Sequence, residues 1–141
     1  MHPIRIVLLA CAFVFACGSK ASSDASVLEV TSPSSRRILH VEDLRKLDRH
    51  EVTLKGARFV GARVQDVVGE LAANELVAVH GADGYTQTLA AATLRREDCL
   101  VAYEKAGEAI SAPEGPLRLV VPGSPGLSVH GLTRIDVRTA P

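Results

Sequence analysis

The sequence predicts a single α+β domain, the class in which strands and helices mix without regular alternation. Three observations predict it. Short apolar runs alternate with polar residues and are separated by glycine, proline or aspartate, as in strands joined by tight turns. Two segments carry apolar residues at helical spacing. The order of the segments does not repeat strand, helix, strand, so a doubly wound parallel sheet is not expected.

Three segments are predicted to be helical. Val41, Leu44 and Leu47 recur at helical spacing, with acids early and bases late as the helix dipole favours, which predicts about two turns. Residues 62–73, "ARVQDVVGELAA", place four apolar residues on one face and predict a longer helix. Residues 94–98, "LRRED", predict one polar helical turn.

The strands are predicted from alternating or continuous apolar runs bounded by turns. Asp83-Gly84 supplies the positive φ of a tight turn between two of them, and Gly107 turns another strand back. Residues 122–131 are too rich in proline and glycine for helix or strand. The predicted strands are VLEV (27–30), two strands around Gly56 (50–61), ELVAVHG (75–81), YTQTLA (85–90), CLVAYE (99–104), PLRLVV (116–121) and LTRIDV (132–137).

The N-terminal residues form a separate segment. Arg5 precedes an unbroken apolar run over 6–16, which is too short for a stable membrane-spanning helix and is typical of a secretory signal. The last residues, "VFAC", resemble the lipobox of bacterial lipoproteins, whose cysteine is lipidated and becomes the new N-terminus. The sequence therefore predicts a lipoprotein signal peptide over residues 1–16 and lipidation of Cys17. An ordinary cleaved signal or an uncut anchor is the alternative.

The rest of the chain is predicted to be a tether and one domain. Residues 17–26 are small and polar, as in a flexible linker, and residues 27–141 suffice for one core. We expect a membrane-anchored protein of the cell envelope that faces the periplasm. The outer membrane is preferred, because Gly18 rather than aspartate follows the lipidated cysteine. Cys99 is then left without a disulfide partner.

The charge balance argues against one class of partner. The chain has 16 basic and 16 acidic side chains, so loss of Arg5 with the signal leaves a net charge of −1. There is no basic stripe or aromatic ladder, and nucleic acid is not expected as a partner. The expected partners are the membrane, through the lipid anchor, and a small-molecule or protein ligand.

Familiar catalytic and metal-binding motifs do not occur. No G-x-S-x-G elbow or phosphate-binding glycine loop occurs, and Cys99 is expected to act as a small buried hydrophobe. The histidines of the domain are not spaced as metal ligands. They are His40, His50, His80 and His130.

Arg118 lies inside the apolar run "EGPLRLVVPG" (114–123) and can be interpreted in two ways. In a strand, Leu117 and Leu119 face a core while Arg118 faces water. Alternatively, a fixed guanidinium beside a Pro-Gly turn suits a phosphate or carboxylate. The residues alone leave both interpretations open.

Five segments, in order, resemble the molybdopterin-binding domain of the sulfite oxidase family of oxidoreductases. The match runs from about Val41 to Val137, and the five segments read FVGARVQDVV, ADGYTQTL, CLVAYEKAGEAI, EGPLRLVVPG and SVHGLTRIDV. The resemblance implies a mixed α/β fold around a pterin cofactor whose dithiolene holds molybdenum.

The resemblance also implies site residues. Arg118 matches the family's strand arginine, and Asp83, Gly84 and Tyr85 match its turn. Residues 128–130 match the Ser-Val-Lys that lies against the cofactor phosphate, with His130 in place of the lysine. The implied cofactor-binding residues are Tyr85, Arg118, Ser128 and His130. Arg58 and Arg63 are further candidates, although a solvated face explains these two arginines better.

The family's metal-ligand cysteine has no counterpart here. Catalytic members supply it from the segment before the "F-x-G-v" helix, but residues 50–61 contain no cysteine. A thiolate is the soft ligand that such a metal site needs. We therefore expect a binding or accessory module without catalysis and without a cofactor. The alternatives are a minimal molybdopterin-dependent oxidoreductase with a different metal ligand, and a purely structural envelope lipoprotein.

Overall fold

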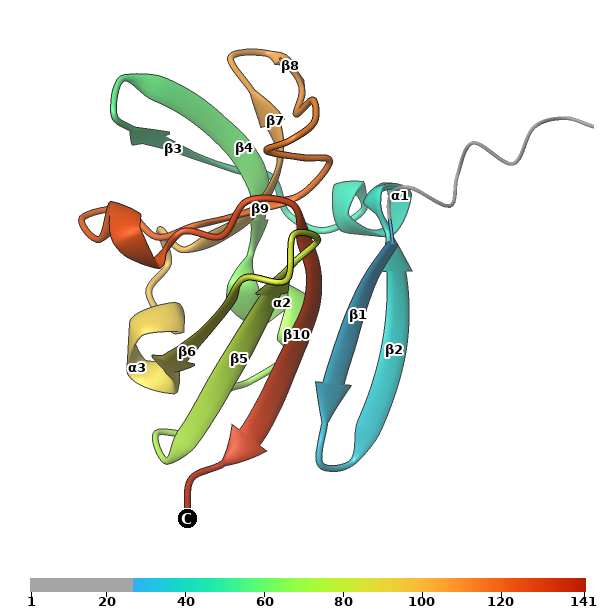
Figure 1. Ribbon diagram of the computed structural model, residues 1–141, viewed down its shortest axis with the longest axis vertical. Helices are drawn as coiled ribbons and strands as arrows, with labels where there is room; N and C mark the ends of the chain where they lie inside the picture. The colour runs from blue at the N-terminus through green and yellow to red at the C-terminus, as the bar shows by residue number, and fades with distance from the viewer. Residues whose placement is uncertain (1–26) are drawn as a thin grey trace, which may run out of the picture.

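The computed structural model describes residues 27–141, which form two five-stranded sheets (Figure 1). The predicted signal peptide, the lipidation site Cys17 and the tether lie outside the described residues. The first sheet has the strand order β2 (Ser35–His40), β1 (Val27–Ser32), β10 (Leu132–Thr139), β5 (Glu75–Gly81) and β6 (Thr86–Ala90). The second has the order β3 (His50–Leu54), β4 (Ala57–Arg63), β7 (Leu100–Lys105) and β8 (Glu108–Ala109), and β9 (Arg118–Val120) also pairs with β7.

Hairpins account for most of the strand pairing. The strand pairs β1–β2, β3–β4, β5–β6 and β7–β8 are each antiparallel and consecutive in the chain. Three of these hairpins surround the turns that the sequence predicted at Gly56, Asp83-Gly84 and Gly107. The exception to the antiparallel pattern is β1 beside β10, which joins the two ends of the domain in parallel register.

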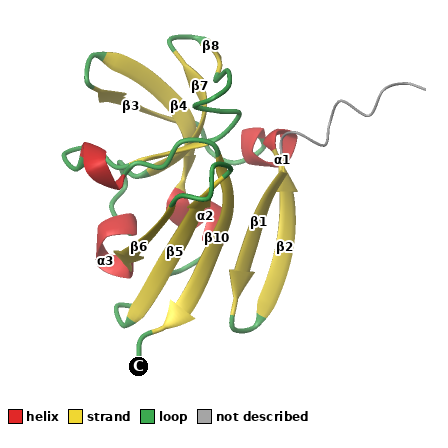
Figure 2. Cartoon of the chain, in the orientation of Figure 1, coloured by secondary structure: helices red, strands yellow, loops and turns green. Residues whose placement is uncertain are grey.

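Strands predominate over helices (Figure 2), so the structure does not confirm the α+β label. The helices are α1 (Val41–Arg45), α2 (Val64–Val68) and α3 (Ala91–Leu94). α1 confirms the first predicted helix in shortened form. α2 is much shorter than predicted, because Gly69 takes φ 86° directly after it and ends the helix. The helical turn predicted over 94–98 is wrong in position, since α3 lies three residues earlier and shares only Leu94 with the predicted range.

One strand differs from prediction for a tertiary reason. The sequence did not predict β2, whose residues are mostly exposed and which is held by its register with β1. The region 122–131 contains no α-helix or strand, as predicted, although it includes the 3-10 turn Pro125–Leu127 and a bridge between Leu119 and Val129.

The buried apolar side chains form two separate groups. The main core lies between the sheets and includes Leu117, Leu119 and Val121. The small core lies on the other face of the second sheet and comprises Leu54, Phe59, Ala102, Ile110 and Val120. Alternate residues of β9 therefore enter different cores. Within residues 27–141 no helix is long and apolar enough to cross a membrane.

Candidate functional site

Three segments that the family resemblance singled out meet at one place. The Ala82 amide donates to the Gly131 carbonyl at 2.8 Å, and the Gly131 amide donates to the Glu114 carbonyl at 2.6 Å. The Leu132 amide donates to the Leu117 carbonyl at 2.8 Å. Backbone hydrogen bonds thus hold the β5–β6 turn, the loop before β9 and the segment before β10 together. We call this place the loop junction.

Glycines permit the close approach at the loop junction. A Cβ on Gly81 would lie 2.8 Å from the His130 carbonyl oxygen and 2.9 Å from Asp83 Oδ1. Gly131 takes φ 57°, in the left-handed region that favours glycine. The conformation at 131 thus favours glycine, whereas the close approach of the backbone excludes a side chain at 81.

The structure places the predicted cofactor-binding residues Tyr85, Ser128 and His130 in different surroundings. Ser128 is buried, and its Oγ accepts a hydrogen bond from the Val121 amide at 3.1 Å. This contact is structural, and the contact of Ser128 with a cofactor stays a prediction. Tyr85 is exposed and its hydroxyl donates to Gln87 Oε1 at 2.9 Å. His130 is exposed on the segment that joins the loop junction.

Arg118 does not face water, which was the first of the two interpretations open to the sequence. It pairs with a carboxylate, as the second interpretation allowed, and that carboxylate belongs to Glu114. The side chain of Arg118 is only 11% exposed, and it points to the small core rather than to water. Its Nη1 donates to Glu114 Oε2 at 3.0 Å, and its Cζ lies 4.9 Å from the centre of the Phe59 ring. Its Nε is buried without a hydrogen-bond partner. Arg118 is thus a nearly buried cation whose Nε donor is both buried and unpaired.

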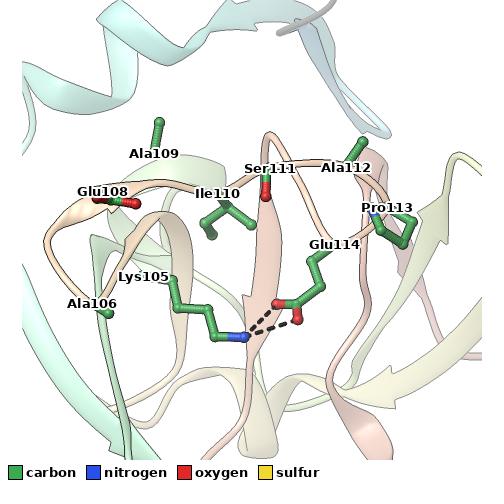
Figure 3. A pocket seen from close by; sticks show the side chains of 9 residues that line it. All are labelled: Lys105, Ala106, Glu108, Ala109, Ile110, Ser111, Ala112, Pro113 and Glu114. Atoms are coloured by element: carbon green, nitrogen blue, oxygen red, sulfur yellow. Dashed lines mark hydrogen bonds and ion pairs between the residues drawn. The ribbon is translucent and has the colours of Figure 1, made fainter.

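Lys105 is the second cation on the same carboxylate (Figure 3). Its Nζ donates to the two carboxylate oxygens of Glu114 at 2.9 and 3.1 Å. The hydrogen bond from Lys105 lowers the pKa of Glu114; burial opposes this, and the charges of Lys105 and Arg118 add to the lowering. The main chain of Glu114 holds the loop junction, so this one residue connects the junction to the cations.

Two pockets flank the ion pairs of Glu114. The loop pocket, about 240 Å³, lies between Lys105 and the segment 108–114, whose side chains surround it in Figure 3. The hairpin pocket, about 140 Å³, lies over the β3–β4 turn. Its lining residues are Leu54, Lys55, Ala57, Phe59, Lys105 and Arg118. Lys105 borders both pockets.

The β3–β4 turn supplies a third cation to the hairpin pocket. Lys55 and Gly56 take φ 50° and φ 78°, the conformation of a two-residue hairpin turn that favours asparagine and glycine. The turn lies within residues 50–61, the segment in which the resemblance places the missing metal-ligand cysteine. A lysine, rather than a thiol, therefore faces the pocket from this segment.

The comparison with protein families gives a match over the whole described domain. The family described as the oxidoreductase molybdopterin binding domain matches residues 27–141. The chain belongs to this family. No curated protein matches the sequence. The description of the family names molybdopterin as the group that the domain binds.

The donor set does not fit a molybdenum centre. The charged groups of the hairpin pocket are Lys55, Lys105 and Arg118, which donate hydrogen bonds and do not ligate a metal. Within residues 27–141, no group of three or more His, Cys, Asp and Glu side chains could hold a metal ion.

Cys99 cannot supply the missing thiolate. Burial raises its pKa to about 11, and its Sγ donates to the Thr93 carbonyl at 3.2 Å. Cys99 precedes β7 whereas Lys105 ends it, a separation of roughly 20 Å along an extended strand. The prediction of an inert, buried thiol is consistent with these surroundings.

The two additional arginines belong to surface ion pairs. Arg58 is 56% exposed and lies 3.9 Å from Glu51, and Arg63 lies 3.0 Å from Asp66. A solvated face explains both residues, as the sequence indicated.

A second polar cluster, which the sequence did not predict, lies on the first sheet. Asp136 accepts from Arg134 Nε at 2.7 Å and lies 3.1 Å from His80 Nε2, and it is also bonded to Thr31. Burial raises the pKa of Asp136, but the hydrogen bonds from these three side chains outweigh it, and the net shift is downward. The cluster links β1, β5 and β10, so its role is to hold the sheet.

The acid sensitivity of the fold tests the Glu114 ion pairs. The lowered pKa means that Glu114 contributes stability above its ordinary pKa of 4.5, and that this contribution is lost as pH falls through the lower, folded-state value. We predict that Glu114→Gln costs about 1–3 kcal/mol of unfolding free energy at pH 7, because Arg118 is left unpaired. The measurement is urea denaturation of both proteins from pH 7 to pH 3.

The difference between the two proteins, rather than either curve alone, is the readout. Asp136 and Asp43 also have lowered pKa values, and they make the stability of the wild type and of the variant depend on pH in the same way. The difference in unfolding free energy between the wild type and Glu114→Gln should be constant around neutral pH and should decrease below about pH 4.5. A difference that stays constant down to pH 3 would contradict the assigned ion pairs.

Proposed function

We propose that this protein is a lipid-anchored component of the cell envelope whose domain, of the molybdopterin-binding oxidoreductase family, acts as a non-catalytic binding or accessory module. The observation that carries the proposal is the β3–β4 turn. In the segment from which the sulfite oxidase-like members supply a thiolate, this chain has no cysteine, and Lys55 of that segment lines a pocket together with Lys105 and Arg118. Because a metal ion and three cations repel one another, the residues favour an anionic ligand over a metal.

The order of segments supports the location. A short charged and apolar segment, a lipobox-like "VFAC" and a small polar stretch precede the first strand. We propose that Cys17 carries the lipid and that the domain faces the periplasm from the outer membrane. The partners are then the membrane and a small-molecule or protein ligand, and no nucleic acid.

Family membership itself favours a second candidate. A minimal molybdopterin-dependent oxidoreductase would use a non-cysteine group at the metal. This candidate requires a pterin in the purified protein, which the first does not.

A cofactor analysis separates the two candidates. The full-length chain, expressed in a host that makes molybdopterin, is denatured and assayed for pterin fluorescence and for molybdenum. We predict far less than one pterin and one metal per chain, because no thiolate is available to hold them. A cysteine-containing family member expressed in the same host is the positive control. Stoichiometric pterin and molybdenum would overturn the non-catalytic proposal.

The lipid anchor is tested by a single substitution. We predict that the full-length chain fractionates with the outer membrane and enters the detergent phase on phase separation. Cys17→Ser should remove it from both, because the lipid chains supply the membrane affinity. Cys11→Ser, within the proposed signal, is the matched control and should leave fractionation unchanged. A Cys17→Ser protein that fractionates like the wild type would show that another site holds the chain.

A further inference from the structure

The hairpin pocket combines cations with an apolar wall. Lys55, Lys105 and Arg118 line it together with Leu54, Ala57 and Phe59. Leu54 and Phe59 are 7% and 1% exposed, so the apolar part belongs to the packed small core. Such a surface suits a ligand that has a negative charge at one end and an apolar body at the other.

The charges of the pocket do not cancel. Within residues 27–141, Lys105 and Arg118 form their ion pairs with the same carboxylate, that of Glu114. Glu114 lines the loop pocket and not the hairpin pocket. The carboxylate of Glu114 therefore balances the charge of only one of the two cations Lys105 and Arg118. Lys55 adds a third positive charge to the hairpin pocket. A bound anion would complete the balance, and Arg118 lies where it can offer a charge-assisted hydrogen bond.

The position of Lys55 is unusual for its residue type. Its φ of 50° lies in the left-handed region, where glycine and asparagine are preferred. The equivalent position of the β7–β8 turn is filled by Ala106, with φ 52°, before Gly107. Nothing in the turn geometry requires a lysine, so its ammonium group is the feature that distinguishes this turn.

The volume limits the ligand. The hairpin pocket measures about 140 Å³. A cavity of about 150 Å³ lined by leucine, isoleucine and phenylalanine accommodates benzene. A pterin is much larger, whereas a single ring or a short aliphatic chain fits.

Resting on the proposed function that the domain is a binding module, we propose that the hairpin pocket binds a small organic carboxylate whose apolar body is no larger than about one benzene ring. The carboxylate pairs with Lys55 and Arg118, and the apolar body lies against the parts of Leu54, Ala57 and Phe59 that border the pocket. The β3–β4 segment thus contributes an ammonium group to an anion site.

Benzoate is the probe for this site. The full-length chain, in a non-ionic detergent, is titrated calorimetrically with sodium benzoate, with benzamide and with inorganic phosphate. We expect benzoate to bind. Benzamide should bind about tenfold more weakly, because it lacks the charge-assisted hydrogen bonds. Phosphate should also bind more weakly, because it has no apolar body to bury.

Two substitutions localise the binding. Lys55→Ala should weaken benzoate binding about tenfold, and Ala106 shows that alanine adopts this backbone conformation in the same chain. Arg58→Ala removes an exposed cation of the neighbouring strand β4 that does not line the pocket, and should change affinity less than about twofold. Thermal unfolding of each variant confirms that it is folded before titration.

Three outcomes overturn the inference: benzoate does not bind, benzamide binds as tightly as benzoate, or Lys55→Ala leaves the affinity unchanged. Failure here is distinguishable from failure of the proposed function. A protein free of molybdenum and pterin that does not bind benzoate refutes the anion site alone. A protein that carries stoichiometric cofactor refutes the proposed function itself.

Discussion

The alternation of side chains along β9 is the constraint on which the site depends. Leu117, Leu119 and Val121 are fully buried in the main core, so the residues between them must face the opposite side of the second sheet. That side is not open water, because Phe59 and Val120 form the small core there. Arg118 is thereby pressed against Phe59 with 11% of its side chain exposed.

A cation in such surroundings has to be paired, and Glu114 supplies the partner. Its carboxylate also binds Lys105, and its backbone carbonyl holds Gly131 at the loop junction. One residue therefore joins the arrangement of the loops to the charge of the site. The chain belongs to the oxidoreductase family, and the three cations that line the hairpin pocket are the reason for which we propose an anion, rather than a metal ion, as its ligand.

The sequence predicted the local features well and the non-local ones poorly. Turn chemistry at Gly56 and Gly84 correctly indicated hairpins, because it depends on neighbouring residues alone. The predicted length of helix α2 was too great, because Gly69 ends the helix although the apolar residues continue at helical spacing beyond it. The alternation around Arg118 was correct for its leucine neighbours. The expectation that Arg118 faces water was wrong, because Phe59, which covers its side chain, comes from a strand far away in the chain.

The sequence did not single out Lys55 and Lys105 of the hairpin pocket, again because their contacts join segments distant in the chain. Lys55 and Lys105 meet Arg118 only through the pairing of β4 with β7 and of β7 with β9. Glu114 was the one member within reach of sequence reasoning, since it begins the same apolar run as Arg118. Ser128 matched the family's pattern, yet its hydroxyl is used by the Val121 amide.

The most direct test of this account is an NMR titration of the ¹⁵N-labelled full-length chain with benzoate, following the backbone amides. The account predicts shifts that saturate and cluster at Lys55, Gly56, Phe59 and Arg118, while the amides of the Asp136 cluster on the first sheet remain unchanged. Shifts that are absent, or that cluster away from the β3–β4 turn, would contradict it.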